Sequence, residues 1–169
     1  FTPTVVGDQL KEPYGETTMD LEVAHAIAPD AKLVVVNARP TVEGDGAFQK
    51  IGQMLEDTNE QFPGAIWSLS IGWGCDKLLT AADLEPVRSA LADAHDNGTT
   101  AFNASGDLAG LECKGGDDWD SPPGPADVGL DSIASLPEMT SVGGTTLSTD
   151  AEGRWLAEQA WFDVPLSQG

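Results

Sequence analysis

The chain alternates between helical and strand-like segments, and this order constrains the possible fold more than any other feature. Three segments show the apolar period of a helix and three are short apolar runs of strand length: residues 15–28, 45–62 and 83–97 for the helices, and 32–38, 65–74 and 99–104 for the strands. Short connections between such segments are typical of right-handed βαβ units with parallel strands. The sequence therefore predicts an α/β fold, with a mainly parallel sheet flanked by helices.

The remaining segments fit one domain. A chain of 169 residues is long enough for one core and short for two, so we expect residues 1–169 to form a single domain. Residues 1–14 are expected to be an extended lead-in. Residues 111–137 are rich in Gly, Pro and Asp and are predicted to form a long surface loop. Residues 139–148 and 154–161 are predicted to pair as a hairpin. The valine-rich run at 32–38 is typical of a strand buried on both faces.

The net charge disfavours two classes of partner. The chain carries 8 basic and 28 acidic residues, a formal charge of −20, and such a field repels nucleic acids and anionic membranes. No apolar run approaches the roughly 18 residues of a membrane span. We therefore expect neither partner. The acidity also suits work at low pH, where protonation of many carboxylates relieves their repulsion. No signal peptide is visible, but the chain could be an internal piece.

The cysteines and histidines do not form a metal-binding pattern. Cys75 and Cys113 follow two predicted strands in Gly-rich loops, so they are either a disulfide formed in an oxidising compartment or two unpaired thiols. His25 and His95 lack a second ligand at a metal-binding spacing. The Asp cluster of residues 115–120 does not have the spacing of an EF-hand loop. We expect no metal site within this chain.

Two acids lie near the start of the first predicted helix. Glu16 and Asp20 are one turn apart, and their stripe continues through Val23, Ala24 and Ile27. This pattern predicts a carboxylate pair aimed at the core or at a cleft, although a solvated acid pair would give the same spacing. Ligands of parallel sheets bind outside the carboxyl ends of the strands. Residues 72–76 and 105–110 are expected at that edge.

Four motifs together resemble those of a known peptidase family. They are the E-x-x-x-D helix at Glu16 and Asp20, S-x-S-x-G ending at Gly72, A-S-G-D-x-x-G around Asp107, and S-V-G-G-T at residues 141–145. In this order they resemble the sedolisin (serine-carboxyl peptidase) family over most of the chain. The resemblance implies a subtilisin-like three-layer α/β fold, incomplete here, with this chain as the central portion of the catalytic domain.

The resemblance also implies roles for individual residues. Glu16 would be the general base for a serine nucleophile, and Asp20 would orient Glu16. Asp107 would line the oxyanion hole, where a carboxylic acid donates a hydrogen bond only while protonated. Ser70 and Gly72 would bind the backbone of a peptide or protein substrate. The implied activity is that of an acid-active, secreted endopeptidase or tripeptidyl-peptidase.

The sequence lacks two features of the family pattern, the nucleophile motif and the calcium-binding segment. It has no G-T-S motif for the nucleophile, so the chain alone is expected to be inactive until the C-terminal part of the domain supplies the serine. The calcium ion that the resemblance implies also belongs to that absent segment. Ile71 stands where relatives often carry an aromatic residue. The alternatives are a non-catalytic acidic peptide-binding module on the same scaffold and an unrelated doubly wound ligand-binding domain. No phosphate-binding glycine loop opens any predicted helix, which disfavours nucleotides.

Overall fold

The computed structural model describes residues 2–7, 15–37, 46–114 and 121–161. Its helices are α1 (Glu16–Ile27), α2 (Ala47–Gln61) and α3 (Ala81–Asp96), with a short 3-10 helix, η1 (Asp76–Leu78). The strands are β1 (Thr4–Gly7), β2 (Val34–Asn37), β3 (Ile66–Leu69), β4 (Thr100–Ala104), β5 (Thr140–Val142), β6 (Thr145–Thr149) and β7 (Trp155–Ala160).

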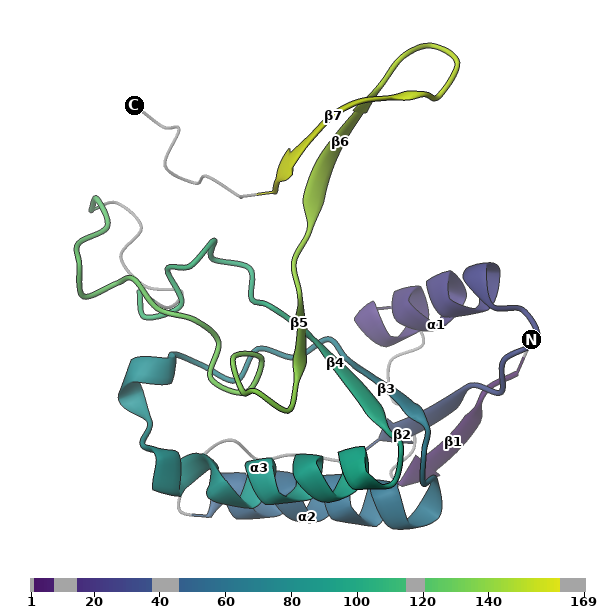
Figure 1. Ribbon diagram of the computed structural model, residues 1–169, viewed down its shortest axis with the longest axis vertical. Helices are drawn as coiled ribbons and strands as arrows, with labels where there is room; N and C mark the ends of the chain where they lie inside the picture. Colours follow the sequence, from purple (N-terminus) through teal and green to yellow (C-terminus); the bar gives the residue numbers. More distant parts are fainter. Residues whose placement is uncertain (1, 8–14, 38–45, 115–120, 162–169) are drawn as a thin grey trace.

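Parallel pairing dominates the strands. β1 pairs with β2, and β3, β4 and β5 form a second sheet in that order, with every pair parallel. β6 and β7 form an antiparallel hairpin that projects from the rest of the molecule (Figure 1). Helices α2 and α3 lie together on one side of the strands, and α1 lies on the other. This arrangement confirms the predicted α/β class, with parallel strands flanked by helices.

The core lies between the α2–α3 pair and the β3–β4–β5 sheet. Helix α3 begins with a capping box in which Thr80 and Asp83 exchange hydrogen bonds, which fixes its first turn. Its apolar face packs against α2 and contacts β4, and its buried side chains belong to the same cluster as Trp67 of β3. The fully or nearly fully buried apolar side chains of this cluster include Ile51, Leu55, Leu84, Val87, Leu91, Ala101, Ile133 and Leu136.

The α2–α3 contact leads to a prediction about Gly52. A Cβ built on Gly52 would lie 2.7 Å from the backbone oxygen of Pro86 on α3, so an added methyl group forces the helices apart. We expect Gly52→Ala to lower the free energy of unfolding by about 1–3 kcal/mol, the usual cost of overpacking. Urea titration of the chain measures this change, with exposed Glu56→Ala on the same helix as control. An unchanged midpoint for Gly52→Ala would show that the helices do not approach as described.

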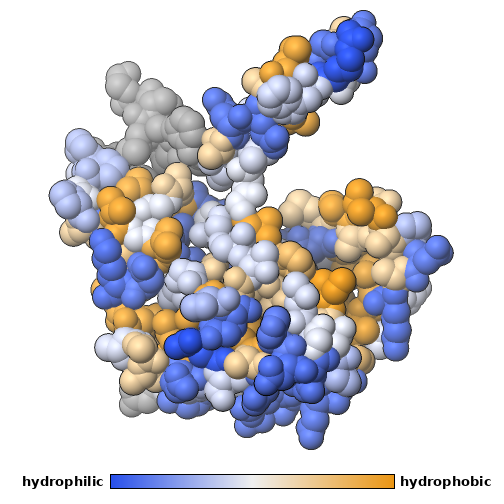
Figure 2. Space-filling model, in the orientation of Figure 1, coloured by the Kyte–Doolittle hydropathy of each residue, from blue (hydrophilic) through white to orange (hydrophobic). Residues whose placement is uncertain are grey.

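The predicted inward face of α1 is wrong. None of its residues is buried, and Val23 and Ile27 are 59% and 84% exposed. The half-buried positions are Thr18, Asp20, Leu21 and His25, and three of them, Thr18, Leu21 and His25, have the spacing of one helix face. The helix is therefore turned relative to the predicted stripe, because apolar residues occur on more than one side of it. Figure 2 shows apolar surface over this helix.

Three further predictions about individual segments need correction. β2 is not buried on both faces, because Val36 is 39% exposed and β2 pairs only with β1 among the described strands. Residues 139–148 do not form one hairpin strand, because β5 joins β4 and only β6 pairs with β7. The described part of the 111–137 loop contains no helix or strand, but its end is not at the surface: Ile133 is 1% exposed and enters the core. The aspartates at 117, 118 and 120 lie outside the described residues.

Candidate active site at the carboxyl edge of β3 and β4

The loops after β3 and β4 lie side by side because these strands are parallel neighbours in register. Ser70 and Gly72 follow β3 directly, and Asp107 follows β4 by three residues. Asn103, the fourth residue of β4, is 1% exposed and joins the two ends. Its amide nitrogen donates to the backbone oxygen of Ile71 at 3.1 Å, and its Oδ1 accepts from the indole nitrogen of Trp73 at 3.0 Å. The segment that carries Ser70 and Gly72 is thereby fixed to β4.

A buried carboxylate holds the far side of the same segment. Asp131 is 1% exposed, and its Oδ2 accepts hydrogen bonds from the backbone N–H groups of Trp73 and Gly74. Its Oδ1 accepts from the backbone N–H of Ala134 at 3.0 Å. Three backbone donors satisfy the carboxylate, as a buried charge requires. These hydrogen bonds therefore join the loop around Asp131 to the loop after β3.

Asp107 lies in a tight turn beyond β4. The turn has left-handed backbone at Gly106, Ala109 and Gly110, with φ values of 108°, 52° and 83°. The Asp107 side chain is exposed. Glu112 closes the turn, because its Oε1 accepts a hydrogen bond from the backbone N–H of Leu108 at 3.0 Å.

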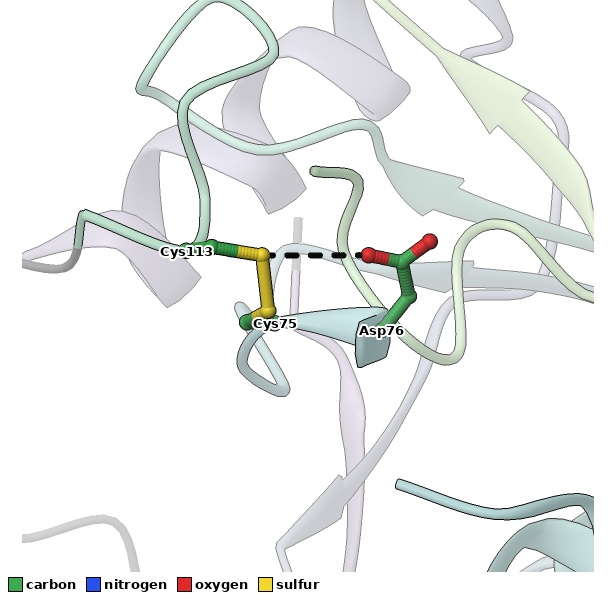
Figure 3. A group of neighbouring side chains, drawn as sticks. All are labelled: Cys75, Asp76 and Cys113. Atoms are coloured by element: carbon green, nitrogen blue, oxygen red, sulfur yellow. Dashed lines mark hydrogen bonds between the residues drawn. A yellow bond between two sulfur atoms is a disulfide. The ribbon is translucent and has the colours of Figure 1, made fainter. Parts of the chain in front are cut away.

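A disulfide ties the two loops together (Figure 3). Cys75 and Cys113 are bonded, with their Cα atoms 4.7 Å apart, so the two open alternatives for these cysteines resolve in favour of the disulfide. A Cβ at Gly129 would overlap Cys113 Sγ, so the close packing around the bond requires glycine there. Asp76 lies beside the bond, and its Oδ1 accepts a hydrogen bond from the backbone N–H of Leu130 at 3.1 Å. The link joins the loop after β3 to the loop after β4.

Among the described residues, the one group of potential metal ligands is Cys75, Asp76 and Cys113. Both sulfur atoms are used in the disulfide, so neither is a thiolate that can bind a metal. We therefore assign no metal to this group. The calcium ion implied by the resemblance would be bound by residues that this sequence does not contain, and it stays a prediction.

Glu16 and Asp20 lie on α1, and no recorded hydrogen bond joins their carboxylates to the described parts of these loops. Glu16 is exposed in the first turn, and Asp20 is half-buried one turn later. The structure records no hydrogen bond or ion pair from either carboxylate to another described residue. The structure thus brings Ser70, Gly72 and Asp107 to one edge, whereas the approach of Glu16 and Asp20 to Asp107 stays a prediction.

Three residues of this edge were not predicted from the sequence. Asn103 could have been predicted, because a polar residue inside an apolar strand needs hydrogen-bond partners. No sequence pattern identifies Asp131 or Glu112. Both lie in a stretch without periodicity, and their partners are backbone N–H groups that no residue pattern identifies.

Glu112 gives a prediction about pH and stability. Burial raises the pKa of its carboxyl group, the hydrogen bond from the Leu108 backbone N–H partly offsets this, and the charges of Asp131 and Asp107 raise it further. The folded state therefore holds this proton more tightly than the unfolded chain does, so the contribution of Glu112 to stability is present at low pH and is lost as pH rises through the folded-state pKa. We expect Glu112→Gln and the unsubstituted chain to have the same free energy of unfolding at about pH 3, and Glu112→Gln to be the more stable of the two at about pH 7. Urea titrations at both pH values measure this difference, and an equal difference at both would contradict it.

Comparisons with known proteins agree with this fold. The sequence matches no protein-family model. It is 33% identical to kumamolisin of Bacillus sp. (strain MN-32) over 156 residues, which is 90% of this chain and 25% of that protein. The structure resembles Pseudomonas sedolisin, a serine-carboxyl proteinase solved in complex with two molecules of pseudo-iodotyrostatin, with a TM-score of 0.60, 24% sequence identity, and coverage of 77% of this chain and 33% of that chain.

The fold is that of an incomplete α/β domain of the kind seen in sedolisin. With the sequence match to kumamolisin, the chain belongs to the sedolisin (serine-carboxyl peptidase) family. It spans about a quarter of the length of kumamolisin. None of the helices within the described residues has both the length and the apolar character that a bilayer span requires.

Proposed function

We propose that this chain supplies the general base, the orienting acid and the oxyanion acid of an acid-active serine-carboxyl peptidase. The observation that supports it best is that Ser70 and Gly72 follow β3 and Asp107 follows β4, two parallel neighbouring strands, in a chain of this family. The serine nucleophile would come from a part of the domain that this sequence does not contain. We call the longer protein that includes it the parent protein.

In this mechanism Glu16 removes the proton from the serine hydroxyl group as the hydroxyl oxygen attacks the substrate carbonyl carbon. Asp20, one helical turn from Glu16, orients the base. The carbonyl oxygen gains negative charge, and protonated Asp107 donates a hydrogen bond to it. Glu16 then returns the proton to the leaving amine, and water hydrolyses the acyl-enzyme by the same sequence of transfers. Ser70 and Gly72 bind the substrate backbone.

Both acids favour activity at low pH. A glutamate base works best near its own pKa, which for an ordinary glutamate is about 4.3. Asp107 donates only while it is protonated. The net charge of −20 at neutral pH adds repulsion that low pH relieves. The disulfide supports a secreted location, because such bonds persist in oxidising compartments.

A peptide-cleavage assay tests the proposal. We expect the parent protein to cleave peptides at about pH 4 and to lose activity at pH 7, whereas these 169 residues alone cleave nothing. A parent protein that has no serine at the nucleophile position and binds peptides without cleaving them would instead be the acidic binding module. Cleavage that is as fast at pH 7 as at pH 4 would contradict the proposed roles of Glu16 and Asp107.

A further inference from the structure

Glu112 contacts both neighbours of Asp107. On the C-terminal side, its Oε1 accepts the hydrogen bond from the backbone N–H of Leu108. On the N-terminal side, a Cβ at Gly106 would overlap the same carboxyl group, so the carboxyl packs directly against the Gly106 backbone. The left-handed φ of 108° at Gly106 suits glycine as well. The conformation of the residue that carries the proposed oxyanion donor is therefore fixed from both sides by one side chain.

Glu112 is itself held in place. Its backbone N–H lies 3.4 Å from the backbone oxygen of Gly129, and the backbone N–H of Gly129 donates to Gly110 at 2.8 Å. The next residue, Cys113, is bonded to Cys75 in the neighbouring loop. An anchored acceptor loses little conformational entropy when it binds Leu108, so its position defines the turn instead of following it.

The carboxyl of Glu112 suits this role at acid pH. Burial raises its pKa, the hydrogen bond from Leu108 opposes that shift, and the nearby charge of Asp131 raises the pKa further, so the group is protonated more readily than an ordinary glutamate. A neutral carboxyl keeps a carbonyl oxygen that accepts from an N–H group. The hydrogen bond to Leu108 thus survives the protonation that activity requires of Asp107.

We propose that Glu112 is a positioning residue that sets the Gly106–Leu108 turn and thereby aims Asp107 at the oxyanion. The inference rests on the proposed function. Displacement of a catalytic group by about 1 Å costs up to about a hundredfold in rate. Glu112 acts through the backbone and does not touch the substrate, so its loss affects kcat far more than KM.

Kinetic comparison of parent-protein variants at about pH 4 tests this role. We expect Glu112→Gln, which keeps an acceptor oxygen of the same reach, to retain kcat within a few fold. Glu112→Ala should lower kcat by about ten- to a hundredfold with little change in KM. Glu60→Ala, an exposed acid on α2, is the matched control and should be unchanged. If Glu112→Ala fails to fold, Glu112→Asp replaces it: its shorter side chain draws the acceptor back from Leu108, so kcat should fall while Glu112→Gln stays active.

Two results would overturn the inference: full kcat in Glu112→Ala or Glu112→Asp, or an equal loss in Glu112→Gln, which would assign the effect to charge and not to the hydrogen bond. The unsubstituted parent protein separates this from the proposed function. If the parent protein itself fails to cleave peptides in acid, the proposed function fails; if it cleaves them and Glu112→Ala does too, only the positioning role fails.

Discussion

Replacing Glu16 with glutamine is expected to lower the kcat of the parent protein by about 10⁴-fold, the scale seen when a triad residue is replaced by its amide. The amide keeps the size of the side chain but cannot accept the serine proton. Glu22→Gln is the matched control, because Glu22 is also an exposed acid on α1. Steady-state kinetics at about pH 4 measure both variants. Equal losses in the two variants, or none in Glu16→Gln, would remove Glu16 from the mechanism.

The second large effect is expected at Asp107. Asp107→Ala removes an oxyanion donor, so kcat should fall by about 10²–10³-fold, equivalent to about 2.7–4 kcal/mol. The urea midpoint should barely change, because the side chain is exposed. Asp107→Asn supplies an N–H donor that needs no protonation. Its activity should therefore exceed that of Asp107→Ala and should extend to higher pH.

Together, these two variants show whether Asp107 donates a hydrogen bond to the oxyanion or only stabilises its turn. If Asp107 only capped its turn, alanine would lower the urea midpoint and leave kcat of the folded protein unchanged. Asparagine would then show no extension of activity toward neutral pH. The pH–rate profile of Asp107→Asn is the more informative readout, because it reports the protonation that the oxyanion donor requires.

Periodicity predicted most of the fold. The order of helices and parallel strands follows from apolar spacing, and the observed α2 and α3 differ from the predicted segments by a few residues at their ends. The face of α1 could not be predicted in the same way. Its apolar residues Met19, Val23 and Ile27 do not share one stripe with the half-buried Leu21, and only tertiary contacts decide which side turns inward.

The site was predictable where strand order sets it. Ser70 and Asp107 reach one edge because β3 and β4 are parallel neighbours, and a helix–strand alternation implies that arrangement. The hydrogen bonds and the disulfide that hold these loops in place were not predictable. Asp131 and Glu112 bind backbone N–H groups at positions that depend on loop conformation, and the pairing of Cys75 with Cys113 depends on the same loops.

The most direct test of the account is an experimental structure of the parent protein with a peptide aldehyde bound to its serine. We predict that a Glu16 carboxyl oxygen lies within about 2.6–3.2 Å of the serine oxygen, with Asp20 against Glu16. The Asp107 carboxyl should lie about 2.7–3.1 Å from the oxygen of the bound aldehyde. A structure with Asp107 facing away from that oxygen, or with α1 remote from the serine, would contradict the account.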